Sequence, residues 1–107
     1  MKEFHLHLVS DATGETLHSV ARACFVQFDG IEPVEHYWPL VRTKGQIEKI
    51  VRNIEEHPGI VLFTIVKEEL RTALEIGCSR LHVPCISVLD PVIHALTAFL
   101  GLESSGK

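Results

Sequence analysis

Apolar residues are arranged in two alternating patterns along the chain, and these patterns predict a succession of strands and helices. Four runs rich in apolar and β-branched residues, at 4–10, 34–41, 59–66 and 83–89, are typical of strands. The last two are almost continuously apolar, as expected for strands that are covered on both faces. Between and after these runs, apolar residues recur at the spacing of one face of a helix.

Four helices are predicted from this spacing. Thr43 and Gln46 form a capping box at the start of the second helix, and Asp90 and Pro91 supply a cap and a first helical residue for the fourth. The predicted apolar faces are Leu17, Val20, Ala21, Cys24, Phe25 and Phe28 in the first helix, Ile47, Ile50, Val51 and Ile54 in the second, and Leu70, Ala73, Leu74 and Leu81 in the third.

The alternation of strand and helix predicts parallel strands joined by right-handed crossovers. We therefore expect a βαβαβαβα chain that folds as an open parallel β-sheet in a three-layer α/β sandwich, Rossmann-like or flavodoxin-like. By analogy with doubly wound sheets, the predicted strand order is 2-1-3-4. One domain is expected over residues 1–101, followed by a tail or truncated end over 102–107. The fourth helix is apolar almost all round, so we expect it to pack on another chain or on a missing part of a longer protein.

Composition and charge narrow the class of protein. The chain has 107 residues and a net charge of -4 without a basic stripe, so nucleic acid is not the expected partner. No apolar run is long enough to cross a membrane, and the amino terminus lacks the apolar region of a signal peptide. The three cysteines, Cys24, Cys78 and Cys85, are odd in number and contain no C-x-x-C. We expect free buried thiols in a reducing cytoplasm.

Ligands of open parallel sheets bind outside the carboxyl ends of the strands, and the polar residues at this edge can be identified from the sequence. They are Ser10, Asp11, Thr13, Gly14, Glu15 and Thr16 after the first strand, Arg42, Thr43 and Lys44 after the second, Thr64 and Lys67 after the third, and Asp90 after the fourth.

The stretch SDATGET, residues 10–16, has two interpretations. A helix start with free amides, hydroxyls and a glycine suits phosphate, and Gly14 lets the backbone approach a ligand closely. Alternatively, Asp11 or Thr13 caps the helix and Gly14 only makes the turn. Arg42 and Lys67 are either cationic clamps for a phosphate or solvated charges.

Two further patterns are weaker. Gly101, Gly106 and Lys107 spell G-x-x-x-x-G-K, but they follow a predicted helix instead of a strand, so we interpret them as a tail. His5 and His7 lie on one face of the first strand, but the sequence offers no evident third ligand. We therefore expect packed histidines and no metal site.

Two stretches resemble a known family. FHLHLVSDATGETLHSVARACFVQF, with its Ser-Asp-x-Thr-Gly-x-Thr loop, and PCISVLDPVIHALTAFLG, with its Val-Leu-Asp-Pro turn, are similar to the bacterial regulatory proteins of pyruvate, phosphate dikinase and of phosphoenolpyruvate synthase. The similarity spans essentially the whole chain. Members of that family are more than twice as long, with their phosphate loop in the second half, so the chain resembles the amino-terminal domain only.

The resemblance implies a cytoplasmic, bifunctional parent enzyme, an ADP-dependent serine/threonine kinase and phosphate-dependent pyrophosphorylase. Such an enzyme phosphorylates a threonine of its dikinase partner with ADP, and removes the phosphate with inorganic phosphate, forming pyrophosphate. ADP and phosphate are then substrates of the full-length protein, and we expect the fragment alone to be inactive. Ser10, Asp11, Thr13, Gly14 and Thr16 match the opening motif, but the resemblance assigns catalysis to no residue.

Several alternatives stay open. The stretch HLHLVSD favours pyruvate, phosphate dikinase as the target, with phosphoenolpyruvate synthase as the other choice. The domain is otherwise a non-catalytic module that recognises the dikinase or forms a homodimer through its fourth helix. A third alternative, a free-standing small-ligand α/β protein, requires that the chain be complete.

Overall fold

The computed structural model describes residues 1–105, in which strands and helices alternate as predicted. The elements are β1 (Lys2–Ser10), α1 (Glu15–Phe25), β2 (Ile31–Trp38), α2 (Lys44–Glu56), β3 (Gly59–Thr64), α3 (Glu68–Leu81), β4 (Cys85–Ser87) and α4 (Asp90–Leu100). The predicted tail is described only to Ser105, and Gly106 and Lys107 of the G-x-x-x-x-G-K pattern lie outside the described residues.

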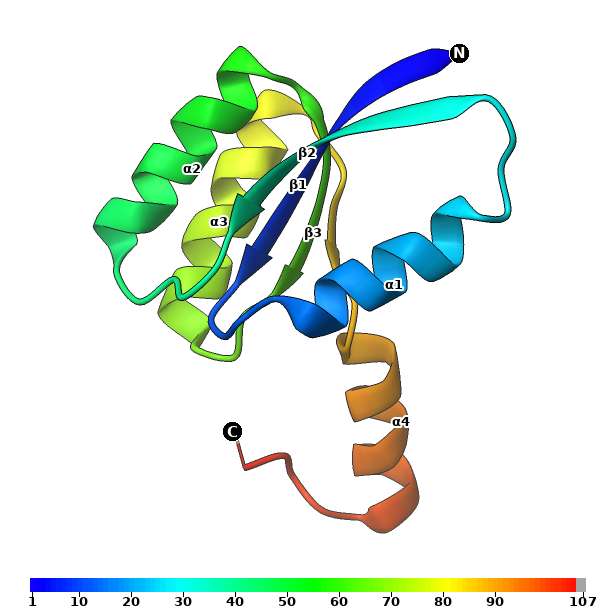
Figure 1. Cartoon of the computed structure of the whole chain (residues 1–107). Helices are drawn as coiled ribbons and strands as arrows, with labels where there is room; N and C mark the ends of the chain where they lie inside the picture. The colour runs from blue at the N-terminus through cyan, green and yellow to red at the C-terminus, as the bar shows by residue number, and fades with distance from the viewer. Residues whose placement is uncertain (106–107) are drawn as a thin grey trace.

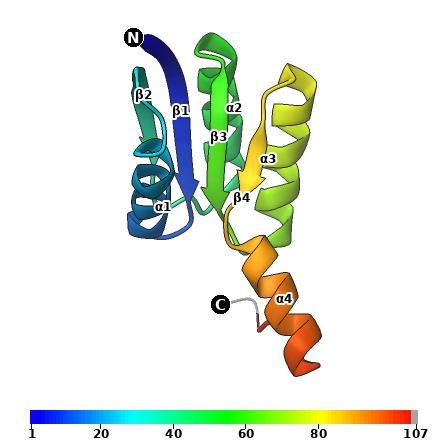
Figure 2. The ribbon, with the colours of Figure 1, turned by 90° about the vertical axis from the view of Figure 1, so that its right-hand side faces the viewer.

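The strands form one open, all-parallel sheet in the order β2-β1-β3-β4, which confirms the predicted α/β class and strand order. β1 and β3 lie at the centre. α1 covers one face of the sheet, and α2 and α3 cover the other (Figures 1 and 2). Parallel strands need a crossover between them, and the helices that make these crossovers cover both faces.

The fourth helix does not belong to either helical layer. α4 projects beyond the carboxyl ends of the strands (Figure 1) and contains no buried residue. Phe99 is 88% exposed and Leu96 is 50% exposed. The helix is therefore apolar and uncovered within the described chain, as its sequence pattern suggested.

The larger part of the core lies between the sheet and the helices α2 and α3. The two helices approach closely at Gly77, where a Cβ atom would lie 2.6 Å from Cγ2 of Val51. Buried residues on this face are Val9, Val41, Ile47, Ile50, Ile54, Val61, Phe63, Ile65, Leu70, Leu74 and Cys78. The cluster on the α1 face is smaller and consists of Leu6, Leu8, Leu17 and Ala21.

The second strand occupies a different range from the predicted one. It begins at Ile31, which pairs with Lys2, and it ends at Trp38. Pro39 follows and cannot donate to a ladder. Leu40 then takes a positive φ of 56°, and its amide donates to the Ala12 carbonyl at 3.0 Å, so the chain turns toward the first loop.

Two predictions about burial were wrong in part. α1 ends at Phe25, so Phe28 lies beyond the helix and is 63% exposed. All three cysteines are free, but only Cys78 is buried, Cys85 is half-buried and Cys24 is exposed. Within residues 1–105, no helix is both long enough and apolar enough to span a membrane.

The predicted cap of the fourth helix was also wrong. Leu89 takes the N-cap position, and its side chain makes no capping hydrogen bond. Asp90 is the first helical residue. The Asp90 carboxylate instead pairs with the guanidinium of Arg71 on α3. Because a full positive charge is a stronger partner than a helix amide, the carboxylate is drawn to Arg71. The proline lies in the first turn of the helix, as predicted.

Candidate functional site

A cleft of about 870 Å³ opens at the carboxyl edge of the sheet, between the β1–α1 loop, the segment after β3, and α4. Its position is the one expected for a ligand site in an open parallel sheet. It is lined by Ser10, Asp11, Ala12, Thr13, Gly14, Glu15, Thr16, Thr64, Ile65, Val66, Glu68, Arg71, Ser87, Leu89, Asp90, Ile93, His94, Thr97, Ser104 and Ser105.

The structure divides the predicted site residues into three groups. The residues of the opening motif, Ser10, Asp11, Thr13, Gly14 and Thr16, all line the cleft. Arg42 and Lys67 line a neighbouring hollow, which also includes Asp11. Thr43 lines neither: its side chain accepts from the Gln46 amide at 3.2 Å, and the two residues form the predicted capping box of α2.

Ser10 and Asp11 are committed to holding the loop in place. The buried Ser10 hydroxyl oxygen accepts from the Ala12 amide at 3.0 Å and from the Thr64 hydroxyl at 3.1 Å. The Asp11 carboxylate accepts from the Val66 amide at 2.8 Å, so it joins the loop after β1 to the segment after β3. These two side chains therefore shape the cleft through contacts within the protein.

Arg42 reinforces the same loop from the side of β2. Its guanidinium donates to the backbone carbonyl of Asp11, and also to the carbonyl of Val41 at 3.2 Å. The sequence left open whether Arg42 is a clamp for phosphate or a solvated charge. In the structure it is exposed, and it bonds to loop backbone.

Gly14 makes the turn into α1. It is the N-cap residue, with a left-handed φ of 84°, and the helix has no side-chain cap hydrogen bond. The interpretation in which Asp11 or Thr13 caps the helix is therefore wrong, because Asp11 bonds to Val66 instead. A Cβ atom here would also lie 2.5 Å from Cε1 of Tyr37, so a larger residue would displace that ring as well as strain the backbone.

Thr13 and Thr16 differ from Ser10 and Asp11 in being free to meet a ligand. Both are exposed at the cleft, and neither side chain hydrogen-bonds to another group within residues 1–105. They flank Gly14 and the start of α1, where the first amides of a helix have no partner within the helix. Hydroxyls and free amides together are suited to accept an anion.

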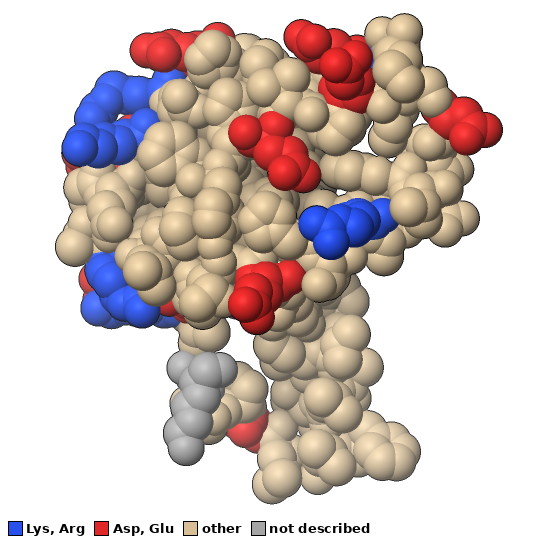
Figure 3. Space-filling model, viewed as in Figure 1, with Lys and Arg blue, Asp and Glu red and all other residues tan. Residues whose placement is uncertain are grey.

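The charged side chains that line the cleft do not favour the binding of an anion. The described lining contains four acidic residues and one arginine, Arg71, which already pairs with Asp90. Burial alone would raise the pKa of Asp90, but hydrogen bonds from Arg71 and Ser87 outweigh it and hold this pKa below its usual value. The acidic residues are Asp11, Glu15, Glu68 and Asp90. Figure 3 shows that α4, which forms one wall of the cleft, carries almost no charge.

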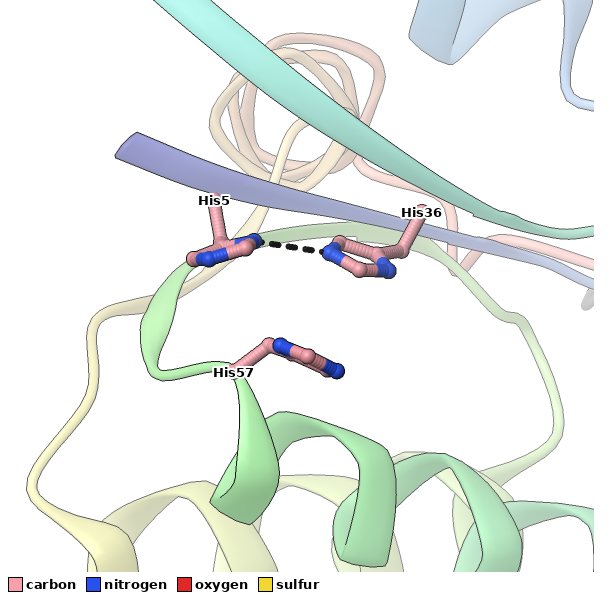
Figure 4. A group of neighbouring side chains, drawn as sticks. All are labelled: His5, His36 and His57. Carbon is pink, nitrogen blue, oxygen red and sulfur yellow. Dashed lines mark hydrogen bonds between the residues drawn. The ribbon is translucent and has the colours of Figure 1, made fainter. Parts of the chain in front are cut away.

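A cluster of histidines lies elsewhere, on the α2 face of the sheet, and the sequence analysis missed it. His5 on β1, His36 on β2 and His57 at the end of α2 each place one ring nitrogen within 4.8 Å of the others (Figure 4). The expectation that His5 has no third ligand nearby is therefore wrong. The three residues are far apart in sequence, and parallel pairing of β1 with β2 and β3 brings them together.

His7 lies next to this cluster and is completely buried. Its ring stacks on His36, with centroids 4.5 Å apart. Its Nε2 lies 2.8 Å from the carbonyl oxygen of His57, and since a carbonyl only accepts, Nε2 carries the proton. Burial lowers the pKa of His7, the hydrogen bond to His57 raises it in part, and the neighbouring imidazoles lower it further. Burial and the charges of His5 and His57 also lower the pKa of His36.

Comparison with known proteins gives the family. The profile of the family described as Kinase/pyrophosphorylase matches residues 6–107. The chain belongs to this family. The match includes the β1–α1 loop and the α4 region, the two stretches on which the resemblance was based.

Relatives within the Kinase/pyrophosphorylase family have names that describe them as pyruvate, phosphate dikinase regulatory proteins. One from Paramagnetospirillum magneticum is 59% identical over 103 residues, 96% of this chain and 33% of its own length. One from Rhizorhabdus wittichii is 47% identical over 107 residues, 100% of this chain and 39% of its own. One from Nitrobacter winogradskyi is 44% identical over 106 residues, which are 99% of this chain and 38% of its own length. The chain therefore spans between a third and two fifths of the length of these curated relatives.

Proposed function

We propose that this chain is the amino-terminal domain of a regulator of pyruvate, phosphate dikinase. The whole regulator phosphorylates a threonine of the dikinase with ADP, and removes that phosphate with inorganic phosphate, forming pyrophosphate. Support comes from the family of the chain and from the names of its relatives. The cleft at the carboxyl edge of the sheet is one wall of the active site.

The observation that carries this proposal is the arrangement around Gly14. Thr13 and Thr16 present free hydroxyls to the cleft beside the first amides of α1, and Ser10 and Asp11 hold the loop in that position. Phosphoryl transfer depends mainly on positioning and on stabilising negative charge. A rigid loop with free donors is suited to hold a phosphoryl group of ADP or inorganic phosphate.

The charge of the cleft indicates what the rest of the regulator contributes. Glu15 and Glu68 repel a phosphate group, and Arg71 is already neutralised by Asp90. The cations needed for ADP must therefore come largely from the remaining length of the protein, so the isolated chain is expected to be inactive. In an amide NMR titration of the chain with ADP, phosphate and pyrophosphate, we expect only weak shifts at Thr13, Gly14 and Glu15.

The test uses a protein that contains this chain together with the remaining length of the family. Thr13→Val removes one hydroxyl without changing the side-chain shape. Loss of a hydrogen bond to a charged group costs about 1.5–3 kcal/mol, so both activities should fall roughly 10- to 100-fold. Ser79→Ala, which removes an exposed hydroxyl at the opposite end of α3, is the control. If Thr13→Val and Thr16→Val both leave the two activities intact, the cleft is not the active site.

A second candidate function is docking through α4, in recognition of the dikinase or in formation of a homodimer. The observation that favours it is the exposure of Val92, Leu96, Phe99 and Leu100 on a helix with no buried residue. Light scattering of the chain and of Leu96→Glu tests dimer formation, and a pull-down with the dikinase tests recognition. A monomer that does not bind the dikinase would exclude this function.

A further inference from the structure

The histidine cluster on the α2 face has the donor set of a metal site. His5 comes from β1, His36 from the neighbouring edge strand β2, and His57 from the C-cap of α2, and their rings face a common space (Figure 4). The ring centroid of His57 lies 5.0 Å from that of His5 and 5.1 Å from that of His36. Three separate elements therefore deliver three imidazoles to one point.

We propose that His5, His36 and His57 form a three-histidine site for a divalent transition metal, with Zn²⁺ as the preferred ion. Imidazole nitrogen is a borderline-soft donor that suits zinc and its neighbours in the first transition row, whereas Mg²⁺ and Ca²⁺ prefer oxygen. Three protein ligands leave the fourth position of a tetrahedral ion open to water or to another ligand.

The distances are compatible with this ion. With zinc–nitrogen bonds of roughly 2.0–2.1 Å, nitrogens around a tetrahedral ion lie about 3.3 Å apart. The three candidate nitrogens lie within 4.8 Å of one another, and Nδ1 of His5 is 2.9 Å from Nε2 of His36. The nitrogens are therefore already near the spacing that a zinc ion requires. All three side chains are half-buried, so an ion can reach them.

Hydrogen bonding explains only part of the arrangement. One bond joins His5 to His36, but within residues 1–105 the ring of His57 makes none. The ring of His57 stacks on that of His36, and a shared ion would join it to both other imidazoles. When zinc binds, the proton between His5 and His36 moves to an outer ring nitrogen, so each neutral imidazole keeps one N–H and donates one lone pair.

His7 is a positioning residue for this site. Its Nε2 donates to the carbonyl of His57, and its ring stacks on that of His36, so it contacts two of the three ligands from the same face of β1 as His5. A histidine in this position fixes the local backbone and a ring plane, as neighbouring residues commonly do around metal ligands.

The site is separate from the cleft. His5 pairs with Gly59 at the first residue of β3, whereas Ser10 of the cleft pairs with Thr64 at its last. The two positions are five residues apart along each strand, which is roughly 16 Å. Zinc here would tie the edge strand β2 to β1 and to the end of α2, and would act on stability instead of on phosphoryl transfer. The proposal is therefore independent of the proposed function.

The experiment is a calorimetric titration of the untagged, chelator-stripped chain with Zn²⁺ at neutral pH, with Mg²⁺ as a second probe. We expect one zinc ion per chain, a higher unfolding temperature with zinc, and no response to Mg²⁺. His36→Gln and His57→Gln should each weaken zinc binding by more than about 100-fold, since even changes to residues around the ligands cost 10- to 100-fold. His82→Asn is the matched control, because it removes an exposed histidine at a left-handed position that asparagine tolerates.

Long-range nitrogen–proton NMR of the wild-type imidazoles identifies the ligands directly and does not depend on a variant that folds. Zinc should shift one ring nitrogen in each of His5, His36 and His57, and leave His82 and His94 unchanged. The proposal is overturned if the folded chain shows no saturable zinc binding. It is equally overturned if binding survives in both glutamine variants, which would place the zinc on other groups such as the free thiols.

Discussion

The two faces of the sheet are covered unequally. On the α2 and α3 side, two helices pack on the strands and on each other, with Gly77 against Val51 and a large buried cluster beneath. On the other side α1 covers only part of the sheet, and Ile86 on β4 is 39% exposed. α4 is more apolar in sequence than α2, yet contains no buried residue. An apolar sequence therefore shows that a helix can be buried. Whether it is buried depends on the presence of another surface that covers it.

The largest expected difference is in the loss of folding stability when a leucine of α3, or a leucine of α4, is replaced by alanine. Leu74 is fully buried, so Leu74→Ala should lower the free energy of unfolding by about 2–5 kcal/mol. Leu96→Ala, at a half-exposed position, should change it by less than about 0.5 kcal/mol. Urea unfolding followed by circular dichroism measures both. A comparable loss in the two variants would mean that α4 is packed in solution.

The contact between α2 and α3 can be tested at Gly77. A methyl group there would meet Val51, so Gly77→Ala should destabilise the chain by about 1–3 kcal/mol, less the gain of up to about 1 kcal/mol in helix propensity. Gly45→Ala on α2 is the control, because its Cβ would make only an ordinary van der Waals contact, 3.8 Å from the Thr43 hydroxyl. The control should be stabilised by up to about 1 kcal/mol. If both variants gain stability, the helices are not in close contact at Gly77.

On the α1 side the corresponding close approach is between Gly14 and Tyr37. Gly14→Ala introduces strain of about 1–2 kcal/mol at the left-handed backbone, and also displaces the tyrosine ring. Gly30→Ala, with a φ of 72° and no atom within 4 Å of the added Cβ, carries the backbone strain alone. Thermal unfolding of the two variants therefore isolates the Tyr37 contact. Equal losses of stability would show that the ring moves away without cost.

The smallest expected effect on folding stability comes from the ion pair between Arg71 and Asp90, which joins α4 to α3. Hydrogen bonds from Arg71 and Ser87 hold the pKa of Asp90 below its usual value, despite an opposing effect of burial. This stabilisation is present above the unfolded pKa of about 3.9, and is lost as the pH falls through the lower folded value. Because the pair is partly exposed, we expect less than about 1 kcal/mol.

Asp90→Asn removes the charge of this pair at neutral pH, without protonating other carboxylates. Amide exchange in α4 should accelerate in this variant, while exchange in α2 and α3 stays unchanged, because the pair joins the first turn of α4 to α3. Exchange that rises equally in all three helices would instead mean that the pair stabilises the whole fold. Arg71→Gln should reproduce the effect of Asp90→Asn.

The local sequence pattern was sufficient to predict those features of the fold that depend on residues close together in the chain. The alternation of apolar runs and helical spacing predicted the order of elements and the parallel sheet, and the resulting order matches the structure. The capping box of Thr43 and Gln46 formed as expected, because its hydrogen bonds join residues three apart. Gly14 also took the turn conformation that its place before a helix suggested.

Only the tertiary structure decided the roles that depend on residues far apart in sequence. Asp11 bonds to Val66, and Asp90 pairs with Arg71, so neither caps a helix. The pairing of strands brings His36 and His57 beside His5 across separations of 31 and 52 residues. Sequence specifies which groups are able to bond. Which of them meet depends on strand order, register and helix packing, and these come from the balance of burial over the whole chain.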